Sequence, residues 1–249
     1  MAAQHEPSQH MGEHPFHRFF RSVSFELDHK LWRKMPRHPS FKHEYWNGKL
    51  HWTPRPNTCD VYLDLERWQP PQPGERSPRA GREPVTVRQL REEDWGHLPR
   101  TFCAASMQWA PLSQWNGAAP LRASRCIIEW ARRGKDGPLV ASACFVALAE
   151  DLVSPGGDDL IAGGAIVTLV PTEGLRGAPG TEGEQVPHLD WIFVAWMEQR
   201  RGIATLLLGA VVKELRALGH RTLASTVLTG HAPALLWHWS RGFRLPCAS

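Results

Sequence analysis

The sequence is poor in cysteine and has no long hydrophobic run. Five cysteines are scattered over 249 residues, and no two of them are separated by only two residues. Their odd number and their spacing argue against a disulfide framework and against a zinc ribbon, and they fit a reducing cytosol. No window approaches the roughly 18 apolar residues that a membrane span needs, and the N-terminus lacks the apolar core of a secretory signal. We therefore expect a cytoplasmic protein without a membrane partner.

A strong excess of one charge is also missing. The formal net charge is +4, which permits an anionic ligand but does not by itself indicate nucleic acid. Basic residues between Lys30 and Lys42 have acidic residues nearby, as on a solvated face. Histidines are frequent before residue 52, but no cysteine or carboxylate accompanies them at a recognised spacing, so we expect a polar tail and no metal site.

What is present is a globular composition, with 42% hydrophobic and 22% charged residues, which argues against full disorder. The clearest boundary is the Pro- and Arg-rich stretch 69–84, whose composition predicts an extended, solvated linker. Before it we expect a flexible tail over 1–14 and a small module over 15–68 that leans on the main domain. In that module Asn47-Gly48 lies between two β-forming runs and predicts a β-hairpin. Cys59–Leu65 alternates and predicts a third strand there.

Residues 85–249 predict a regular alternation of strands and helices. Apolar or alternating β-forming runs predict strands over 85–90, 139–148, 160–170, 189–194 and 222–228. Apolar spacings, acidic starts and glycine ends predict helices over 91–107, 124–133, 202–218 and 232–240. The strands over 139–148 and 160–170 are expected to form a hairpin. This order is that of an α/β (α+β) domain.

The loop before the helix over 202–218 has the features of an anion site. The segment reads Gln199-Arg200-Arg201-Gly202-Ile203-Ala204 and joins a predicted strand to that helix. The first turn of a helix has unpaired N–H groups and a partial positive charge, so it favours phosphate. Gly202 and the small Ala204 would let an anion approach the backbone closely, and Arg200 and Arg201 add positive charge.

These six residues match the signature Q/R-x-x-G-x-G/A, and the chain resembles the GNAT superfamily of acyl-CoA-dependent N-acyltransferases. Val85–Trp95 looks like the family's first strand and helix start, and Ala234–Phe243 looks like its last helix with a closing Gly-Phe. The resemblance covers roughly residues 84–249 and leaves out the N-terminal module. It implies a central mixed sheet flanked by helices, in which two parallel strands splay apart at a bulge.

The resemblance also implies a donor and the residues that hold it. Acetyl-CoA would be the acyl donor, with its pyrophosphate on the turn formed by Gln199, Arg200, Arg201, Gly202, Ile203 and Ala204. Its pantetheine arm would pair with the backbone of Ile192, Phe193 and Val194. Holding the thioester beside the amine would supply much of the rate through proximity.

His188 and Asp190 are the candidates for removing the amine proton. Several family members carry the base at these positions of the strand before the signature. Residues two apart share a strand face, so both side chains are expected to point the same way. A neutral imidazole suits amine deprotonation near pH 7, and a carboxylate would act through water or by raising the pKa of the histidine. The alternative is a surface histidine and an aspartate beside the turn. The base position of other members, on the next strand, is Thr226 here, which cannot take a proton.

The proton for the departing thiolate has a less usual candidate. The family's acid is a tyrosine four residues before the glycine of the closing Gly-Phe, and His238 stands at that position. It either protonates the thiolate or serves packing or substrate contact. His231 replaces the family's usual asparagine, which weakens a cofactor contact there. Cys247 has no basic partner at a motif spacing, so we do not expect it to be a nucleophile.

These observations predict an N-acyltransferase that moves acetyl from CoA directly to a primary amine of a small molecule or peptide. The alternative is a non-catalytic acyl-CoA-binding module, because the tyrosine and the acid on the next strand are missing. Nucleic acid is not the expected partner, and a homodimer is left open. The acceptor region would hold Trp109, Trp115, Trp130 and the Gly-rich loop over 174–183, which suit an apolar or cationic amine or serve packing.

Overall fold

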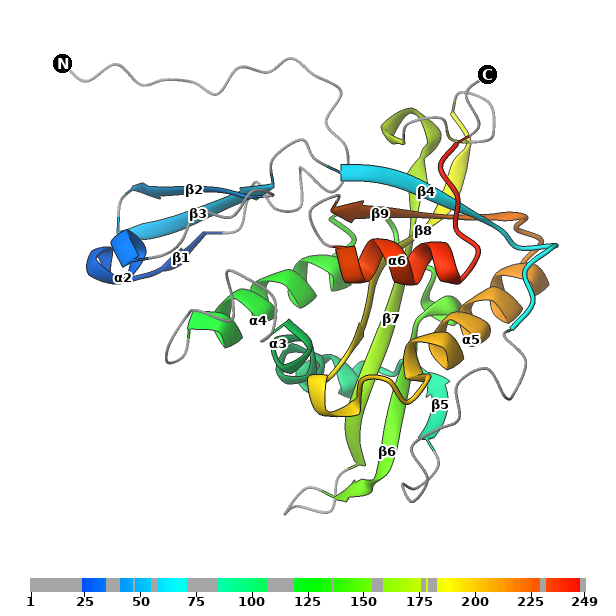
Figure 1. The fold of residues 1–249 in the computed structure, drawn as a ribbon, viewed down its shortest axis with the longest axis horizontal. Coiled ribbons are helices and arrows are strands. Elements are labelled where there is room, and N and C mark those ends of the chain that lie inside the picture. Colours follow the sequence, from blue (N-terminus) through cyan, green and yellow to red (C-terminus); the bar gives the residue numbers. More distant parts are fainter. Residues whose placement is uncertain are drawn as a thin grey trace.

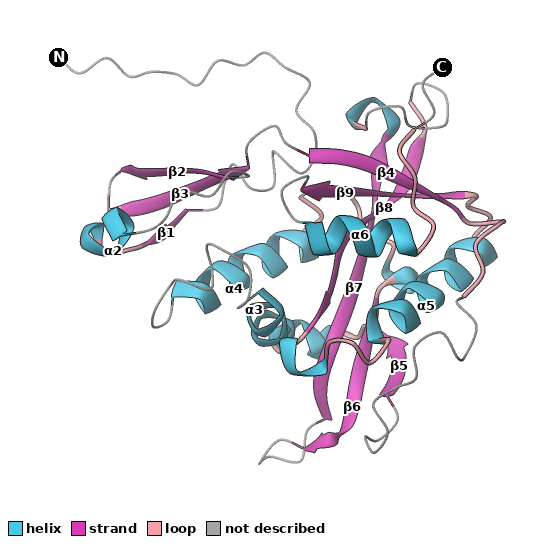
Figure 2. Ribbon diagram, in the orientation of Figure 1, coloured by secondary structure: helices cyan, strands magenta, loops and turns pink. Residues whose placement is uncertain are grey.

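The computed structural model describes residues 24–34, 41–46, 48–54, 58–70, 85–106, 119–135, 137–153, 159–175, 178, 183–228 and 232–246. Within these residues the strands form two sheets, one in the order β1-β3-β2 and a larger one in the order β4-β9-β8-β7-β6-β5 (Figures 1 and 2). Several parts named above lie outside the described residues: the tail over 1–14, most of the linker over 69–84, most of the loop over 174–183, and Trp109, Trp115, His231 and Cys247.

The larger sheet confirms the predicted mixed architecture. Its strands are β4 (Thr58–Asp64), β5 (Val85–Gln89), β6 (Phe145–Val153), β7 (Asp159–Pro171), β8 (Gln185–Val194) and β9 (Thr222–Leu228). All neighbouring pairs of described strands in it are antiparallel except β8 with β9, which is parallel. The hairpin expected between the middle strands is formed by β6 and β7.

Helices cover both faces of this sheet. They are α3 (Leu98–Ser106), α4 (Ala119–Arg132), α5 (Ile203–Ala217) and α6 (Ala232–Ser240). Phe193 belongs to the core cluster of α3 and α4, whereas its neighbour Val194 belongs to the cluster of α5. Because successive strand residues point to opposite faces, α3 and α4 lie on one face and α5 lies on the other.

Several predicted elements differ from the structure at their ends. The helix predicted over 91–107 is divided into a 3₁₀ turn, η1 (Glu92–Gly96), and α3, since Pro99 suits a first helical turn and not a helix interior. The helix predicted from residue 124 already begins at Ala119. The strand predicted over 139–148 begins at Phe145, because Ala141–Ala143 forms a 3₁₀ turn, η3.

The strand predicted over Cys59–Leu65 forms as β4, but its expected place in the N-terminal module is wrong. β4 pairs with β9 from Thr58↔Leu228 to Asp64↔Thr222 and is an edge strand of the larger sheet. Its side chains Val61 and Leu63 are buried in the core cluster of α5. Alternation identifies such a strand, and the large apolar face available on this sheet decides where it pairs.

Hydrogen bonds from α5 and from the segment after α6 hold the segment around β4 in place. Tyr62 and Arg244 exchange two backbone hydrogen bonds of 2.8 Å. After the strand, the indole Nε1 of Trp68 donates to the carbonyl of Arg241 at 2.9 Å. The Arg216 guanidinium on α5 donates to the carbonyls of Leu65 at 2.5 Å and Trp68 at 2.6 Å. Residues 58–68 are therefore part of the main domain.

The smaller sheet contains the hairpin predicted around Gly48. β1 (Ser24–Glu26) and β2 (Phe41–Trp46) both pair antiparallel with β3 (Lys49–Pro54), and the short helix α2 (His29–Lys34) follows β1. Leu27 and Leu50 are buried in the same core cluster as Ile127 of α4. The small sheet thus lies beside α4, as Figure 1 shows, and packs against the main domain.

We expect a chain that starts at Pro84 to be insoluble or unfolded, because it lacks β4. Val61, Leu63 and Leu65 are each at most 2% exposed, and burying one such side chain is worth about 1.5–3 kcal/mol. Their joint loss is on the order of the whole stability of a domain, about 5–15 kcal/mol.

A chain that starts at Asn57 keeps β4 and is the matched control. It should melt cooperatively by circular dichroism and remain soluble. A chain from Pro84 that melts at the same temperature as the chain from Asn57 would show that β4 is dispensable.

Candidate functional site

The two parallel strands of the larger sheet part soon after they meet. β8 pairs with β9 only at His188↔Ala224 and Leu189↔Ser225. On its other side β8 has Leu189 opposite Val167 and Trp191 opposite Ile166, so Asp190 is an extra residue, a β-bulge. Beyond it, Ile192, Phe193 and Val194 stay paired with β7 but fall outside the described register with β9. The splayed parallel pair at a bulge is therefore confirmed.

The turn that leads into α5 contains two residues in the left-handed backbone region. Arg200 has φ 64° and Gly202 has φ 81°. A Cβ placed on Gly202 would have no heavy atom within 4 Å, so the space in front of this glycine is open. The Gly202 carbonyl accepts the N–H groups of Thr205 and Leu206 at 2.9 and 3.0 Å. The N–H groups before these are those that a helix start leaves without an internal carbonyl.

Side chains within the turn hold its shape. The Gln199 amide donates to the carbonyl of Val194 at 3.2 Å, which ties the turn to the end of β8. The Arg201 guanidinium bonds the carboxylate of Glu198, and both side chains are at most 7% exposed. Arg200, in contrast, is exposed. Arg201 thus braces the turn from inside, and Arg200 is the arginine that faces solvent.

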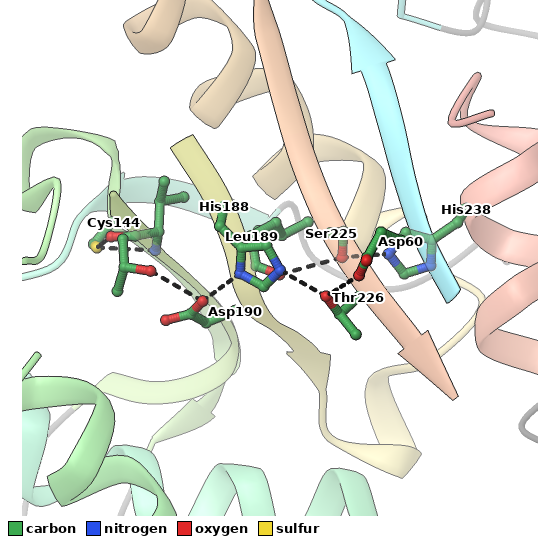
Figure 3. Close-up of polar contacts among 10 residues, drawn as sticks. Asp60, Cys144, His188, Leu189, Asp190, Ser225, Thr226 and His238 are labelled. Atoms are coloured by element: carbon green, nitrogen blue, oxygen red, sulfur yellow. Dashed lines mark hydrogen bonds and ion pairs between the residues drawn. The ribbon is translucent and has the colours of Figure 1, made fainter. Parts of the chain in front are cut away.

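A connected set of polar side chains crosses the sheet beside the bulge (Figure 3). His188 Nδ1 lies 2.5 Å from Asp190 Oδ1, and His188 Nε2 lies 3.0 Å from Thr226 Oγ1. The Thr226 hydroxyl donates to Asp60 Oδ1 at 2.8 Å, and the Thr168 hydroxyl donates to Asp190 Oδ1 at 3.0 Å. These five residues come from β4, β7, β8 and β9, and we call them the polar chain.

The polar chain is buried, and one of its oxygen atoms has no partner. His188 and Asp60 are each 3% exposed, and the side chain of Asp190 is 4% exposed. The shared face predicted for His188 and Asp190 is confirmed, and the alternative of a surface histidine is wrong. Asp190 Oδ2 is buried without a hydrogen-bond partner among the described residues.

The polar chain lies on the sheet face that α3 and α4 cover. Ser225 and Val227 flank Thr226 on β9, and Val227 packs in the core cluster of α5. Because neighbours on a strand point to opposite faces, Thr226 points to the face of α3 and α4. The open turn at Gly202 begins α5, which covers the other face. The turn and the polar chain thus lie on opposite faces of the sheet, on either side of the gap between β8 and β9.

His238 lies on α6 near the last paired rung of β8 and β9. Its Nδ1 is 2.7 Å from the carbonyl of Ala234, which can only accept, so this nitrogen carries a proton. Its Nε2 is 3.1 Å from Ser225 Oγ, and its ring packs against Phe243 at a centroid distance of 4.9 Å. His238 is 6% exposed. In the neutral ring Nε2 is an acceptor, and only the imidazolium can donate from it.

Other candidates have a structural place. Trp130 is partly buried and packs against the core cluster of α3 and α4, in agreement with the alternative that it serves packing. Over the described parts of the chain, no group of three or more His, Cys, Asp or Glu residues is arranged to hold a metal ion. None of the described helices is both long and apolar enough to span a membrane.

Three residues of these contacts, Asp60, Thr226 and Glu198, were not expected from the sequence. Asp60 stood inside an alternating strand with no indication of its neighbour. Thr226 cannot act as a base, and its place between His188 and Asp60 depends on the pairing of strands that are distant in the sequence. The buried pair of Glu198 with Arg201 has no sequence pattern of its own that distinguishes it from a solvated i,i+3 pair. The polar position of Asp60 in a run of apolar side chains is the one signal that could have drawn attention to it.

Comparison with known proteins gives the family of this chain. The family model described as the acetyltransferase (GNAT) family matches residues 89–243. A search among curated proteins finds no significant match. Among solved structures, an aminoglycoside N-acetyltransferase in complex with CoA is similar, with 20% identity and a TM-score of 0.44 over 69% of this chain and 94% of that chain.

Two further solved structures illustrate the same similarity. A protein from Pyrococcus horikoshii has 17% identity and a TM-score of 0.47, over 67% of this chain and 92% of that chain. A GNAT family acetyltransferase from Brucella melitensis in complex with acetyl-CoA has 18% identity and a TM-score of 0.38, over 56% of this chain and 73% of that chain.

The residues matched by the family model make up more than half of the chain. They include the bulge at Asp190, the turn over 199–202 and the helix that carries His238. The chain therefore belongs to the GNAT family of acetyltransferases.

Proposed function

We propose that this acetyltransferase takes acetyl from acetyl-CoA and transfers it directly to a primary amine of a small molecule or peptide. The observation that carries the proposal is the unpartnered, buried Asp190 Oδ2 at the bulge where β8 and β9 part. A buried carboxylate oxygen without a hydrogen bond is costly unless a ligand or water meets it. A primary ammonium or amine can donate an N–H hydrogen bond to such a carboxylate oxygen.

The donor would bind on the other side of the gap. Gly202 leaves open space before the first N–H groups of α5, and Arg200 and Gly202 together form a turn whose N–H groups suit a phosphate. Arg200 would add charge through its side chain, and Arg201, which is bonded to Glu198, would add only its backbone N–H. The backbone of Ile192, Phe193 and Val194, beyond the register with β9, is available for the amide groups of pantetheine.

In the proposed reaction the amine nitrogen attacks the thioester carbonyl carbon. Its proton passes to Asp190 Oδ2, the C–S bond breaks, and the CoA thiolate leaves and takes up a proton. His188 stands behind Asp190 and holds it by the 2.5 Å contact at Oδ1. His238 remains the candidate for protonating the thiolate, and it can do so from Nε2 only as an imidazolium, because Nδ1 is bonded to Ala234.

Direct transfer is supported by the state of the described cysteines. Burial raises the pKa of Cys59, Cys103, Cys126 and Cys144, for Cys144 to about 12. The thiolate is the nucleophilic form of cysteine, so these thiols are poor acyl carriers near pH 7. This supports direct transfer over a route through a thioester of one of these cysteines.

The test of the function is release of CoA when the protein, acetyl-CoA and a panel of primary amines are mixed. Release that depends on an amine, with the acetylated amine detected by mass spectrometry, supports the proposal. Tight binding of acetyl-CoA without release for any amine would instead indicate a non-catalytic acyl-CoA-binding module.

For donor binding we expect Gly202→Glu to abolish acetyl-CoA affinity, because the side chain fills the open space and repels the pyrophosphate. Gly219→Glu is the matched control: Gly219 has φ 84°, a Cβ there also meets nothing within 4 Å, and it follows the other end of α5. Both variants carry the same backbone strain and the same charge. Isothermal calorimetry should show lost binding in the first and wild-type binding in the second. Equal affinities in the two folded variants would reject the turn as the phosphate site.

For the base we expect Asp190→Asn to lower kcat/KM for the amine by about 10²–10⁴-fold, the usual range for loss of a general base. The amide keeps the size of the side chain but cannot take the proton. The dissociation constant of acetyl-CoA should stay within about twofold, because the phosphate turn lies beyond the gap.

His188→Gln is the comparison variant for Asp190→Asn. Its amide reaches the position of Nε2 and keeps the contact with Thr226, but it loses the contact with Asp190. We expect a smaller loss than in Asp190→Asn. A larger loss in His188→Gln would make the histidine the base, and wild-type rates in both variants would leave proton removal to solvent.

A further inference from the structure

One member of the polar chain comes from outside the residues that define the family. Asp60 lies on β4, before residues 89–243 that match the family model. It is 3% exposed and accepts the hydroxyl of Thr226 at 2.8 Å. Asp60 is thus a buried carboxylate that an N-terminal strand places two hydrogen bonds from His188.

Counting protons shows what Asp60 does to His188. Three contacts link the series Asp190, His188, Thr226 and Asp60, and each needs one hydrogen atom. The threonine hydroxyl supplies one and a neutral imidazole supplies one, so a third proton is required. Because Thr226 donates to Asp60, its oxygen can only accept from His188 Nε2. The contact of Nδ1 with Asp190 Oδ1 needs a proton as well, and we place the third proton on His188 and not on a carboxyl group, because imidazole is ordinarily more basic than a carboxylate.

Without the charge of Asp60, nothing would require His188 to carry two protons. The Thr226 hydroxyl could then rotate and donate to Nε2, which would leave His188 neutral with its one proton toward Asp190. When Asp60 is charged, the imidazolium of His188 contacts Asp190 on β8 directly. It is linked to Asp60 on β4 through the hydroxyl of Thr226 on β9. Buried charges of this kind are stable only when they are paired and hydrogen-bonded, as these are.

The other titratable groups nearby do not compete for this proton. Burial, aided by the Asp190 carboxylate, raises the pKa of Cys144 to about 12. Burial and then the Asp60 carboxylate raise the pKa of Tyr62 above its ordinary value. His238 contacts Ser225, which points to the opposite face of β9 from Thr226. The hydroxyl of Thr168, on β7, bonds to Asp190 and does not titrate.

We propose that Asp60 is a positioning residue that, through Thr226, keeps His188 doubly protonated and thereby keeps Asp190 ionised with Oδ2 directed to the amine. This inference rests on the proposed function, since it assigns a role in the same reaction. It makes the N-terminal strand β4 a part of the catalytic apparatus as well as an edge of the sheet.

The test compares Asp60→Asn with Asp64→Asn. Both replace a carboxylate of β4 with an amide, but the side chain of Asp64 is 53% exposed and accepts from the backbone N–H groups of Glu66 and Arg67. Asparagine keeps the size and an oxygen that can accept from Thr226, so the substitution removes the charge alone. The ring-nitrogen NMR shifts of His188 are followed against pH without substrate. We expect the pKa of His188 to fall by about one unit or more in Asp60→Asn and to stay unchanged in Asp64→Asn.

A second pair of variants covers a failure of Asp60→Asn to fold. Thr226→Val breaks the link to Asp60 and should lower the pKa of His188 in the same way. Thr226→Ser keeps a hydroxyl and should restore the wild-type value. An unchanged pKa of His188 in a folded Asp60→Asn or Thr226→Val variant overturns the proposal.

The kinetic arm uses an amine accepted by the wild-type protein. Loss of the positive neighbour raises the pKa of Asp190, so the acidic limb of the kcat/KM profile should move to higher pH in Asp60→Asn. On that limb a shift of one unit lowers kcat/KM about tenfold. Acetyl-CoA affinity should not change. A lowered pKa of His188 with an unmoved rate profile overturns the positioning role.

The two arms separate the possible failures. If the wild-type protein acetylates no amine of the panel, the proposed function fails and the positioning role falls with it. The NMR comparison then still decides whether Asp60 sets the charge of His188, because it needs neither donor nor acceptor.

Discussion

The short parallel pairing of β8 with β9 is the constraint on which the rest of the structure depends. Two paired residues hold the strands together, and the bulge at Asp190 then turns β8 away. A sheet that continued its pairing would satisfy its own backbone groups and leave none for a ligand. Because the pairing stops, the strand ends separate. The open turn at Gly202 lies on one side of the gap, and the polar chain lies on the other. The bulge also gives Asp190 a direction that a regular strand position would not.

The N-terminal strand β4 joins stability to chemistry in this protein. Its apolar side chains close the core cluster of α5, and its backbone completes the pairing of β9. Asp60, the carboxylate that it buries, accepts the hydroxyl of Thr226. A carboxylate at such a place costs stability unless a positive charge compensates it. In the arrangement that we propose, the imidazolium of His188 provides that compensation, and the contact that holds the edge strand also sets the charge beside Asp190.

Much of the fold was predictable from the sequence, and the reasons are local. The strand over 222–228 and the helix over 232–240 form at the predicted residues, because alternation and apolar spacing are properties of short segments. The turn that leads into α5 was recognisable from six residues for the same reason. The partner of β4 was not, because alternation defines a strand but not its neighbour. Asp60 and Thr226 are 166 positions apart, and only the folded sheet brings them together. Pro99 also explains why the predicted helix is divided, because proline fits the first turn of α3 and not a helix interior.

The distance along the chain between β4 and β9 also has a consequence for synthesis. β4 leaves the ribosome early, whereas the strand that it pairs with follows some 166 residues later. At about 5–20 residues per second, roughly 8 to 33 seconds separate the two. During this interval Val61 and Leu63 have no apolar surface of β9 to cover them and are a natural substrate for a chaperone. Asp60 likewise has no Thr226 to accept from, so a nascent chain that has already folded β5 to β8 still lacks the charge arrangement beside Asp190. Folding of the N-terminal strand onto the sheet is therefore a late event, and it is the event that completes the polar chain.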